Sequence, residues 1–336
     1  MMPALEELRR DFIVGAPGEV PAPVKGWRPG VLSDLGPSVA VIGAFDGVHL
    51  GHCSLIDAAV REATERGMAS VAVTFLPDPD EVVSPRPDLK LCTADDRLEL
   101  LARSGVDAVL VVPFTRSISR LTHAEFFKRI LLPACDVRSI HVGTDFRLGY
   151  RGASTVPVMR AWCAGEGIDL AGHELLNVDG EVVSSTHIRG HLAAGELERA
   201  TRLLGRRPML RGTVNTGRGE GTGMGFPTAN VAVAPKLQVP AEGVYGGLAL
   251  VDGMVWPAAI NVGKPPTFRD RAASASLEAN LIGFSGDIYG SAISLAFLWR
   301  IRGLVEFASL DDLIATVLGN IEEVRDALGE SGVALA

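Results

Sequence analysis

The chain has 336 residues, 47 % of them hydrophobic and 21 % charged, which suits a globular protein of two domains. Its net charge of −8 argues against general binding to nucleic acids or anionic membranes, so an anionic ligand would need a local site. The four cysteines show neither C-x-x-C nor zinc-ligand spacing, so we expect reduced thiols. The sequence has no signal-peptide core and no apolar run of about 18 residues. We therefore expect a cytoplasmic protein without a membrane span.

Residues 1–36 are rich in proline and show no clear period of apolar residues. We expect them to form a leader that packs against the first domain, and we assign them no function.

Patterns of strands and helices alternate from residue 38 onwards. Strands are predicted at 39–42, 70–75, 108–112 and 139–142, and helices at 54–66, 93–104, 122–132, 156–166, 186–194 and 197–204. Such alternation is typical of an α/β fold with a parallel sheet, helices on both faces and right-handed crossovers. We therefore predict a Rossmann-like domain over residues 37–204.

The pattern changes at Gly-Arg-Arg-Pro, residues 205–208. Short alternating runs follow at 209–215, 228–233, 243–250, 254–261, 276–282 and 291–301. Asp252-Gly253 is a hairpin signal, and Ser309 is a typical N-cap for a last helix over 309–328. We predict a small antiparallel β-barrel with a C-terminal helix over residues 205–336.

The most informative stretch is G-A-F-D-G-V-H-L-G-H at residues 43–52, between a predicted strand and a predicted helix. A backbone with Gly43 and Gly51 can approach an anion closely, and Phe45 lies within the same turn. N–H groups at a helix start attract phosphate, and His49 and His52 can donate hydrogen bonds to it. The pattern predicts a site for a nucleotide polyphosphate.

Two further motifs belong to the same predicted domain. G-T-D-F-R-L-G at 143–149 follows a strand, at the sheet edge where ligands bind in parallel sheets. S-S-T-H-I-R at 184–189 opens a helix, whose hydroxyls, N–H groups and arginine suit a second anion. The candidate residues in these motifs are Asp145, Phe146, Ser185, Thr186 and Arg189.

The predicted barrel carries G-F-P-T-A-N at 225–230, after a glycine-rich segment that begins at residue 217. Such a loop, ending at Gly225, can fold over phosphates. Thr228 and Asn230 are two residues apart, so on a strand their oxygens face the same way and can hold a Mg²⁺–nucleotide. Glu278 adds a carboxylate on a later strand.

Taken singly, these residues also have structural explanations. Ser185 and Thr186 are suitable helix caps, and Asp145 suits a turn. Arg189 is compatible with a surface arginine, and Glu278 with an exposed strand carboxylate. The order of the motifs across both domains favours the functional interpretation.

The three motifs of the first domain, in this order, resemble the adenylyltransferase half of the bifunctional riboflavin kinase/FAD synthetase family. The resemblance implies that the FMN phosphate attacks the α-phosphate of ATP and that pyrophosphate leaves, with Mg²⁺ as cofactor and without a covalent intermediate. It implies catalytic roles for His49, His52 and Arg189. The phosphates of ATP would also contact Gly43, Phe45, Gly51, Ser185 and Thr186, and the flavin would lie near Asp145 and Phe146.

G-F-P-T-A-N resembles the riboflavin kinase barrel, as do L-E at 277–278, G-D-I-Y-G at 286–290 and N-V-G-x-x-P-T-F at 261–268. The resemblance implies transfer of the γ-phosphate of ATP to the 5′-hydroxyl of riboflavin, with Glu278 as general base. Gly225, Thr228 and Asn230 would bind Mg²⁺–ATP. The implied partners are riboflavin, FMN, FAD and ATP, with neither nucleic acid nor membrane; no pattern indicates an oligomeric state.

The chain departs from the family pattern at a few positions. Ala44 stands where Asn is frequent, Asp78 where His usually lies between two prolines, and Glu220 and Thr222 where basic residues are common. A carboxylate at 78 would face phosphates, which is unfavourable unless it meets a metal or an arginine. Two alternatives therefore stay open: a riboflavin kinase with a degenerate adenylyltransferase half, and a non-catalytic flavin- or nucleotide-binding protein.

Overall fold

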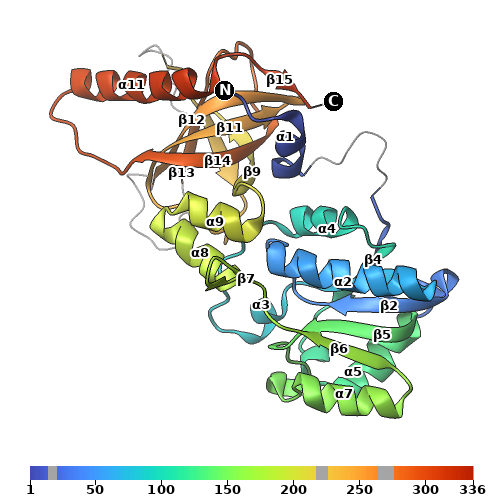
Figure 1. Cartoon of the computed structure of the whole chain (residues 1–336). Coiled ribbons are helices and arrows are strands. Elements are labelled where there is room, and N and C mark those ends of the chain that lie inside the picture. The colour runs from blue at the N-terminus through green and yellow to red at the C-terminus, as the bar shows by residue number, and fades with distance from the viewer. Residues whose placement is uncertain (14–20, 217–225, 264–275, 336) are drawn as a thin grey trace. The chain divides into compact units, whose positions relative to one another are not determined.

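A computed structural model of the chain describes residues 1–13, 21–216, 226–263 and 276–335 (Figure 1). Contacts divide the chain into two compact units. The sheet unit comprises residues 19–88 and 94–185, and the barrel unit comprises residues 1–18, 89–93 and 186–336.

The sheet unit is built on a parallel sheet with strand order β1-β4-β3-β2-β5-β6. Its strands are β1 (Val24–Gly26), β2 (Pro37–Ile42), β3 (Ala69–Leu76), β4 (Ala108–Pro113), β5 (Asp136–Gly143) and β6 (Asp169–His173). The predicted α/β fold is confirmed, and β1 and β6 are strands that the sequence patterns did not indicate.

Helices cover both faces of this sheet (Figure 1). They are α2 (Leu50–Arg66), α3 (Pro79–Val83), α4 (Ala94–Ala102), α5 (His123–Phe126), α6 (Leu132–Ala134) and α7 (Val156–Gly165). Alternate residues of β2 point to opposite faces, because side chains alternate along a strand. Val39 and Val41 pack with α2 and α4, whereas Ala40 and Ile42 pack with α5 and α7.

Short elements complete the sheet unit. The helix predicted over 122–132 is divided into α5, a π-helical turn at Phe127–Leu131 and α6. Single 3₁₀ turns lie at Ser33–Leu35, Ile118–Arg120 and Tyr150–Gly152, and β7 (Asn177–Val178) pairs with β8 (Glu181–Val182) in a hairpin.

The barrel unit is an antiparallel barrel that closes because β11 pairs with both β14 and β12. Around the ring the order is β11 (Gly243–Val251), β14 (Ala292–Arg302), β9 (Met209–Asn215), β10 (Ala229–Val233), β13 (Ser276–Leu281) and β12 (Met254–Gly263). Asp252 and Gly253 have φ values of 48° and 76°, so they form the predicted tight hairpin between β11 and β12. The predicted barrel is confirmed.

Further elements accompany the barrel. They are α1 (Leu5–Asp11), α8 (Ser185–Ala194), α9 (Leu197–Leu204), α11 (Leu310–Leu328) and β15 (Val333–Ala334), which pairs with β12. Ser309 caps α11 as predicted, because its Oγ accepts a hydrogen bond of 3.1 Å from the N–H of Asp312. Among the described residues, no helix is both long and apolar enough to cross a membrane.

The N-terminal residues do not form the single leader expected on the first domain. Leu8 and Phe12 are fully buried in the core of the barrel unit, whereas β1 extends the sheet of the other unit. The buried Asp11 accepts a hydrogen bond of 3.0 Å from the N–H of Arg207 and pairs with its guanidinium, which also contacts Glu7. These contacts fix α1 beside the start of β9.

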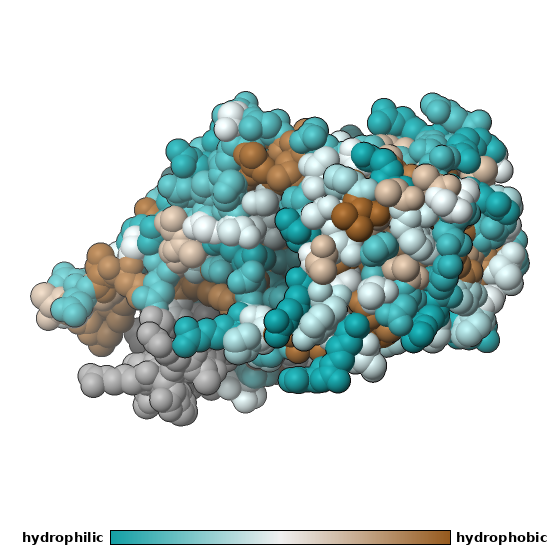
Figure 2. Space-filling view, turned by 90° about the horizontal axis from the view of Figure 1, so that it is seen from below, coloured by the Kyte–Doolittle hydropathy of each residue, from teal (hydrophilic) through white to brown (hydrophobic). Residues whose placement is uncertain are grey.

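The molecular surface in Figure 2 is mainly hydrophilic. Hydrophobic residues on this face lie in small separate groups, without a broad apolar area among the described residues. Scattered groups of this kind are normal on a protein surface and indicate no docking site.

Candidate active sites

The motifs of the sheet unit meet at the carboxyl edge of its sheet. The chain passes from β2 to β3 and β4 on one side, and β5 and β6 lie on the other side. Between β2 and β5 the direction of strand succession therefore reverses, and ligands of open α/β sheets bind at such a point. Gly43 follows β2 there, and Asp145 follows β5.

The glycine turn after β2 has an unusual backbone. Phe45, Gly47 and Val48 have positive φ values of 57°, 77° and 38°, and each such non-glycine residue costs on the order of 1 kcal/mol or more. The turn is held by hydrogen bonds from Val48 N–H to the carbonyl of Phe45 (3.0 Å) and from Ser185 Oγ to the carbonyl of Asp46 (3.0 Å). The side chain of Phe45 is fully buried. The surrounding structure thus imposes a strained turn, as binding sites commonly do.

His49 has a defined orientation at the start of α2. It is the N-cap residue, and its Nδ1 accepts a hydrogen bond of 3.3 Å from the N–H of His52. In the neutral ring the proton must then be on Nε2, which is a donor. The rings of His49 and His52 are stacked with centroids 3.6 Å apart, and a Cβ at Gly51 would lie 3.3 Å from the His49 ring. The motif therefore combines a helix start with two stacked imidazoles.

Asp78 does not face an open phosphate site. Its side chain is buried and pairs with Arg97, and Glu81 completes a capping box at the start of α3. The arginine that the sequence analysis required for a carboxylate here is therefore present. Arg97 was not selected from the sequence, although one signal exists: it precedes the buried Leu101 by four residues, so helical spacing places it on the buried face of α4.

The flavin candidates lie in the turn after β5. Phe146 N–H donates to the carbonyl of Gly143 (3.0 Å), and a Cβ at Gly143 would lie 2.8 Å from Asp145 Oδ1. The Asp145 carboxylate is exposed and lies back over Gly143, whereas Phe146 packs partly against the sheet core. The carboxylate is therefore accessible at the carboxyl edge of the sheet.

The contacts of the S-S-T-H-I-R motif divide its residues between the two units. Ser185 braces the glycine turn within the sheet unit. Thr186 and Arg189 belong to the barrel unit, where Arg189 donates a hydrogen bond of 3.2 Å to Thr186 Oγ1 in the first turn of α8. The structure therefore brings Ser185 to the glycine turn and Arg189 to Thr186.

A row of polar side chains crosses the barrel. Asn230 pairs in register with Asn215 on one side and Glu278 on the other, and Glu278 pairs with Asn261. Residues directly opposite each other on paired strands share one face. We call Asn215, Asn230, Glu278 and Asn261 the polar row. It places the predicted Asn230 and Glu278 side by side. It adds Asn215, which no motif indicated, and Asn261, which lies in the N-V-G-x-x-P-T-F motif but received no role of its own.

The entry to β10 is fixed by a buried amide. Asn280 Nδ2 donates to the carbonyl of Pro227 (2.8 Å), and half-buried Thr228 follows immediately before the strand. Gly225, Glu220 and Thr222 lie outside the described residues, so their predicted roles stay predictions. Within the described chain, no group of three or more His, Cys, Asp or Glu side chains could hold a metal ion.

Three residues distant in sequence form a hydrogen-bonded chain between α2, β5 and β6. His141 bridges Glu62 (Nε2 to Oε2, 2.8 Å) and His173 (Nδ1 to Nε2, 2.9 Å). Burial alone would raise the pKa of Glu62, but the neighbouring polar side chains, among them Arg66 and His141 with hydrogen bonds to its carboxylate, outweigh it and lower this pKa. Burial lowers the pKa of His173, and the charge of His141 lowers it further. No sequence motif indicated a role for these histidines.

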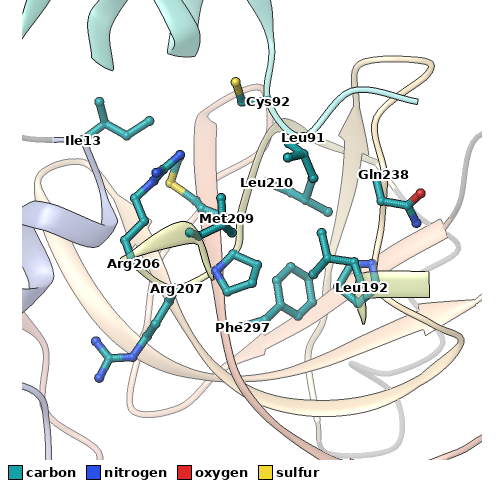
Figure 3. Close-up of a pocket in the computed structure, with 13 residues that line it drawn as sticks. Ile13, Leu91, Cys92, Leu192, Arg206, Arg207, Met209, Leu210, Gln238 and Phe297 are labelled. Atoms are coloured by element: carbon teal, nitrogen blue, oxygen red, sulfur yellow. The ribbon is translucent and has the colours of Figure 1, made fainter. Parts of the chain in front are cut away.

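Two cavities lie away from the predicted residues. The cavity in Figure 3, within the barrel unit, has a volume of about 20 Å³ and is lined by residues that include Leu192, Met209 and Phe297. This volume accommodates about one water molecule. A wider cavity of about 610 Å³ in the sheet unit is lined by residues that include Glu62 and Arg160. Neither contains a residue that the motifs single out.

Comparison with known proteins agrees with this arrangement. The family described as FAD synthetase matches residues 32–187, and the family described as riboflavin kinase matches residues 204–328. A bifunctional riboflavin kinase/FMN adenylyltransferase of Pseudomonas fluorescens is 34 % identical over 85 % of this chain and 92 % of its own length. The protein of the same description from Bacillus subtilis is 33 % identical over 82 % and 88 %.

A solved structure has the same fold over most of the chain. It is described as a macrolide-efflux protein from Streptococcus pneumoniae, with a TM-score of 0.80 and 28 % identity over 90 % of this chain and 99 % of its own. Both halves of the chain thus match in order and almost in full, and the chain belongs to the bifunctional riboflavin kinase/FMN adenylyltransferase family.

Proposed function

We propose that the glycine turn of the sheet unit is the site of FMN adenylylation and that the polar row of the barrel is the site of riboflavin phosphorylation. As a member of its family, the chain uses ATP for two successive transfers. In the first, the γ-phosphate of ATP passes to the 5′-hydroxyl of riboflavin and leaves ADP. In the second, a phosphate oxygen of FMN attacks the α-phosphorus of ATP, and the bond to pyrophosphate breaks as FAD forms.

The adenylylation site works by positioning and charge stabilisation. His49 Nε2–H and the His52 ring donate to the triphosphate, beside the backbone of Gly43, Phe45 and Gly51. Ser185 keeps the turn in place. For Thr186 and Arg189, which belong to the other unit, a role in binding the phosphates rests on the sequence motif alone. Asp145 and Phe146, which follow β5 at the same edge of the sheet, are assigned to the flavin. The observation that supports this assignment is the single tautomer that the contact with the His52 N–H imposes on His49.

In the barrel, Glu278 accepts the proton of the riboflavin 5′-hydroxyl as the oxygen attacks. Its register with Asn230 and Asn261 places the carboxylate among amide groups that can orient the hydroxyl and the phosphates. Thr228 is assigned to the phosphates of ATP, and so is Gly225, whose role rests on the sequence motif alone.

Thr228 and Asn230 would hold Mg²⁺ together with ATP. Hydroxyl and amide oxygens fit a hard cation that keeps several waters and binds mainly through substrate phosphates, and such a site needs no cluster of acidic ligands. The ion would neutralise charge on the transferred phosphate. The four cysteines are free thiols, which supports the expected cytoplasmic location.

The alternative of a kinase with a degenerate adenylyltransferase half was motivated by Asp78. Because Asp78 is buried and paired with Arg97, it adds no exposed negative charge to the phosphate site. The geometry therefore favours two working sites over this alternative. It favours them also over a non-catalytic flavin carrier, because flavin binding alone does not require a carboxylate such as Glu278 beside Asn230.

The two assignments are tested by separating the two activities in one chain. Purified protein is incubated with ATP and Mg²⁺ plus riboflavin or FMN, and the flavins are resolved by chromatography. Glu278→Ala should lower FMN formation by about 10²-fold or more and leave FMN-to-FAD conversion intact. His52→Ala should lower FAD formation by a similar factor and leave FMN formation intact. Equal loss of both activities in either folded variant would contradict the assignment, and a chelator should stop both.

A further inference from the structure

Arg97 is a buried guanidinium that joins three segments of the sheet unit. It and Asp78 are each only 4 % exposed. Its Nη1 donates to the carbonyl of Ala44 (3.0 Å) and pairs with Asp78, and its Nη2 donates to the carbonyl of Phe75 (2.9 Å). One side chain of α4 therefore connects the glycine turn, the end of β3 and the start of α3.

The carbonyl of Ala44 has a second buried donor. Thr74, which is fully buried on β3, donates from Oγ1 to the same oxygen at 3.2 Å. The C=O and N–H of a planar trans peptide point in opposite directions. With the Ala44 oxygen held towards Thr74 and Arg97, the N–H of Phe45 points away from them. Phe45 is also the first residue of the turn with a positive φ, so this peptide plane sets the path of the strained backbone that follows.

Asp78 supplies the charge that allows Arg97 to be buried. A buried guanidinium needs a carboxylate and further acceptors, and here it has Asp78 and two carbonyl oxygens. Asp78 is itself fixed by the capping box of α3, in which its N–H donates to Glu81 Oε2 at 3.0 Å. The two carbonyl oxygens fix the orientation of Arg97, and the capping box fixes that of Asp78.

We propose that Asp78 and Arg97 form a positioning pair for the adenylylation site: they fix the Ala44–Phe45 peptide and thereby the phosphate-binding turn. This inference depends on the proposed assignment of the glycine turn to ATP. Neither residue touches the reacting atoms in this proposal. The pair acts through the backbone, so it affects FMN adenylylation and leaves riboflavin phosphorylation, which takes place in the barrel, unchanged.

The test uses Arg97→Lys in the full chain. Lysine keeps the charge for Asp78 but lacks the planar fork that reaches two carbonyls at once. Misplacement of a positioning group by about 1 Å can cost on the order of 10²-fold, so kcat/KM for ATP in FMN adenylylation should fall by about 10- to 100-fold. Riboflavin phosphorylation should stay within about twofold of the unmodified chain. Asp78→Asn should lower the same parameter, and the double variant should lose less than the product of the two single effects.

Arg103→Lys is the matched control, because Arg103 follows the same helix and pairs with Glu99 instead of the turn. Hydrogen exchange of the 43–49 peptide reports on the turn directly and should increase in Arg97→Lys but not in Arg103→Lys. Unchanged adenylylation in Arg97→Lys would overturn the inference. Equal loss of both activities with a lowered unfolding midpoint would also overturn it, because the role would then be structural. Failure of the site assignment is distinguished by His52→Ala, which would then keep its adenylylation activity.

Discussion

His49 combines two tasks in one ring. Nδ1 accepts the His52 N–H and so caps α2, while Nε2 is left with the proton that can be donated to a phosphate. A substitution can therefore separate the capping function of Nδ1 from the donor function of Nε2. Asparagine is a good N-cap acceptor, but its side chain is shorter and has no group at the position of Nε2.

We expect His49→Asn to keep the stability of the chain within about 0.5 kcal/mol, because the cap is retained. FMN adenylylation should nevertheless fall by about 10²-fold or more, since a phosphate donor is lost. His49→Ala should show the same loss of activity and, in addition, a loss of about 1 kcal/mol in stability. Thermal unfolding and the rate of FAD formation from FMN measure the two effects. Full activity of His49→Asn would show that Nε2 does not contact the transferred nucleotide.

The helix α2 is fixed at both ends. It begins at the glycine turn with His49, and near its end Glu62 is bound to His141 of β5, which in turn contacts His173 of β6. The position of the helix start relative to the sheet thus depends on a hydrogen-bonded chain that includes two imidazoles. Burial and the charges of His141 and Arg61 lower the pKa of His173, and Glu62 opposes them.

A group whose folded pKa lies below its unfolded value stabilises the folded state above the unfolded pKa and loses this contribution as pH falls. For His173 the loss begins near its ordinary pKa of 6.5, whereas Glu62 stays charged until below 4.5. The midpoint temperature of unfolding should therefore decrease as the pH is lowered from about 7.5 to about 5.5. His173→Gln should make this decrease smaller. His187→Gln, at an exposed position of α8, is the control. Equal slopes in both variants would exclude His173 as the source.

At the scale of the whole molecule, periodicity predicted the regular elements because each strand and helix repeats its own burial pattern. The short β1 was missed because Val24–Gly26 are all exposed, and only pairing with β4 makes them a strand. The contact of Lys90 with Leu237, which gives residues 89–93 to the barrel unit, joins positions far apart in sequence. No local pattern reports such a contact.

The same distinction applies to the sites. His49, His52, Asn230 and Glu278 lie in short motifs and were selected from the sequence. Arg97 and Asn215 were not, and Asn261 lies in a motif but received no role. The importance of these three residues comes from partners on other elements: the carbonyl of Ala44 for Arg97, and register neighbours for the two asparagines. Domain bounds also depend on contacts between elements that are far apart in sequence. For this reason α8 and α9 were expected with the first domain, whereas their contacts are with the barrel.

The division into two units leads to a prediction about the flow of FMN. Each transfer is assigned to its own set of reacting groups, so a chain with one defective site should still complete the other reaction. A mixture of Glu278→Ala and His52→Ala should therefore convert riboflavin to FAD, although neither variant does so alone. FMN must then leave one molecule and enter another, so FAD should appear after a lag that lengthens when both proteins are diluted. Chromatography of the flavins over time measures this, with the unmodified chain as reference. If FMN accumulates in the mixture without FAD, or if no FMN is released, exchange through solvent is wrong and transfer within one chain is required.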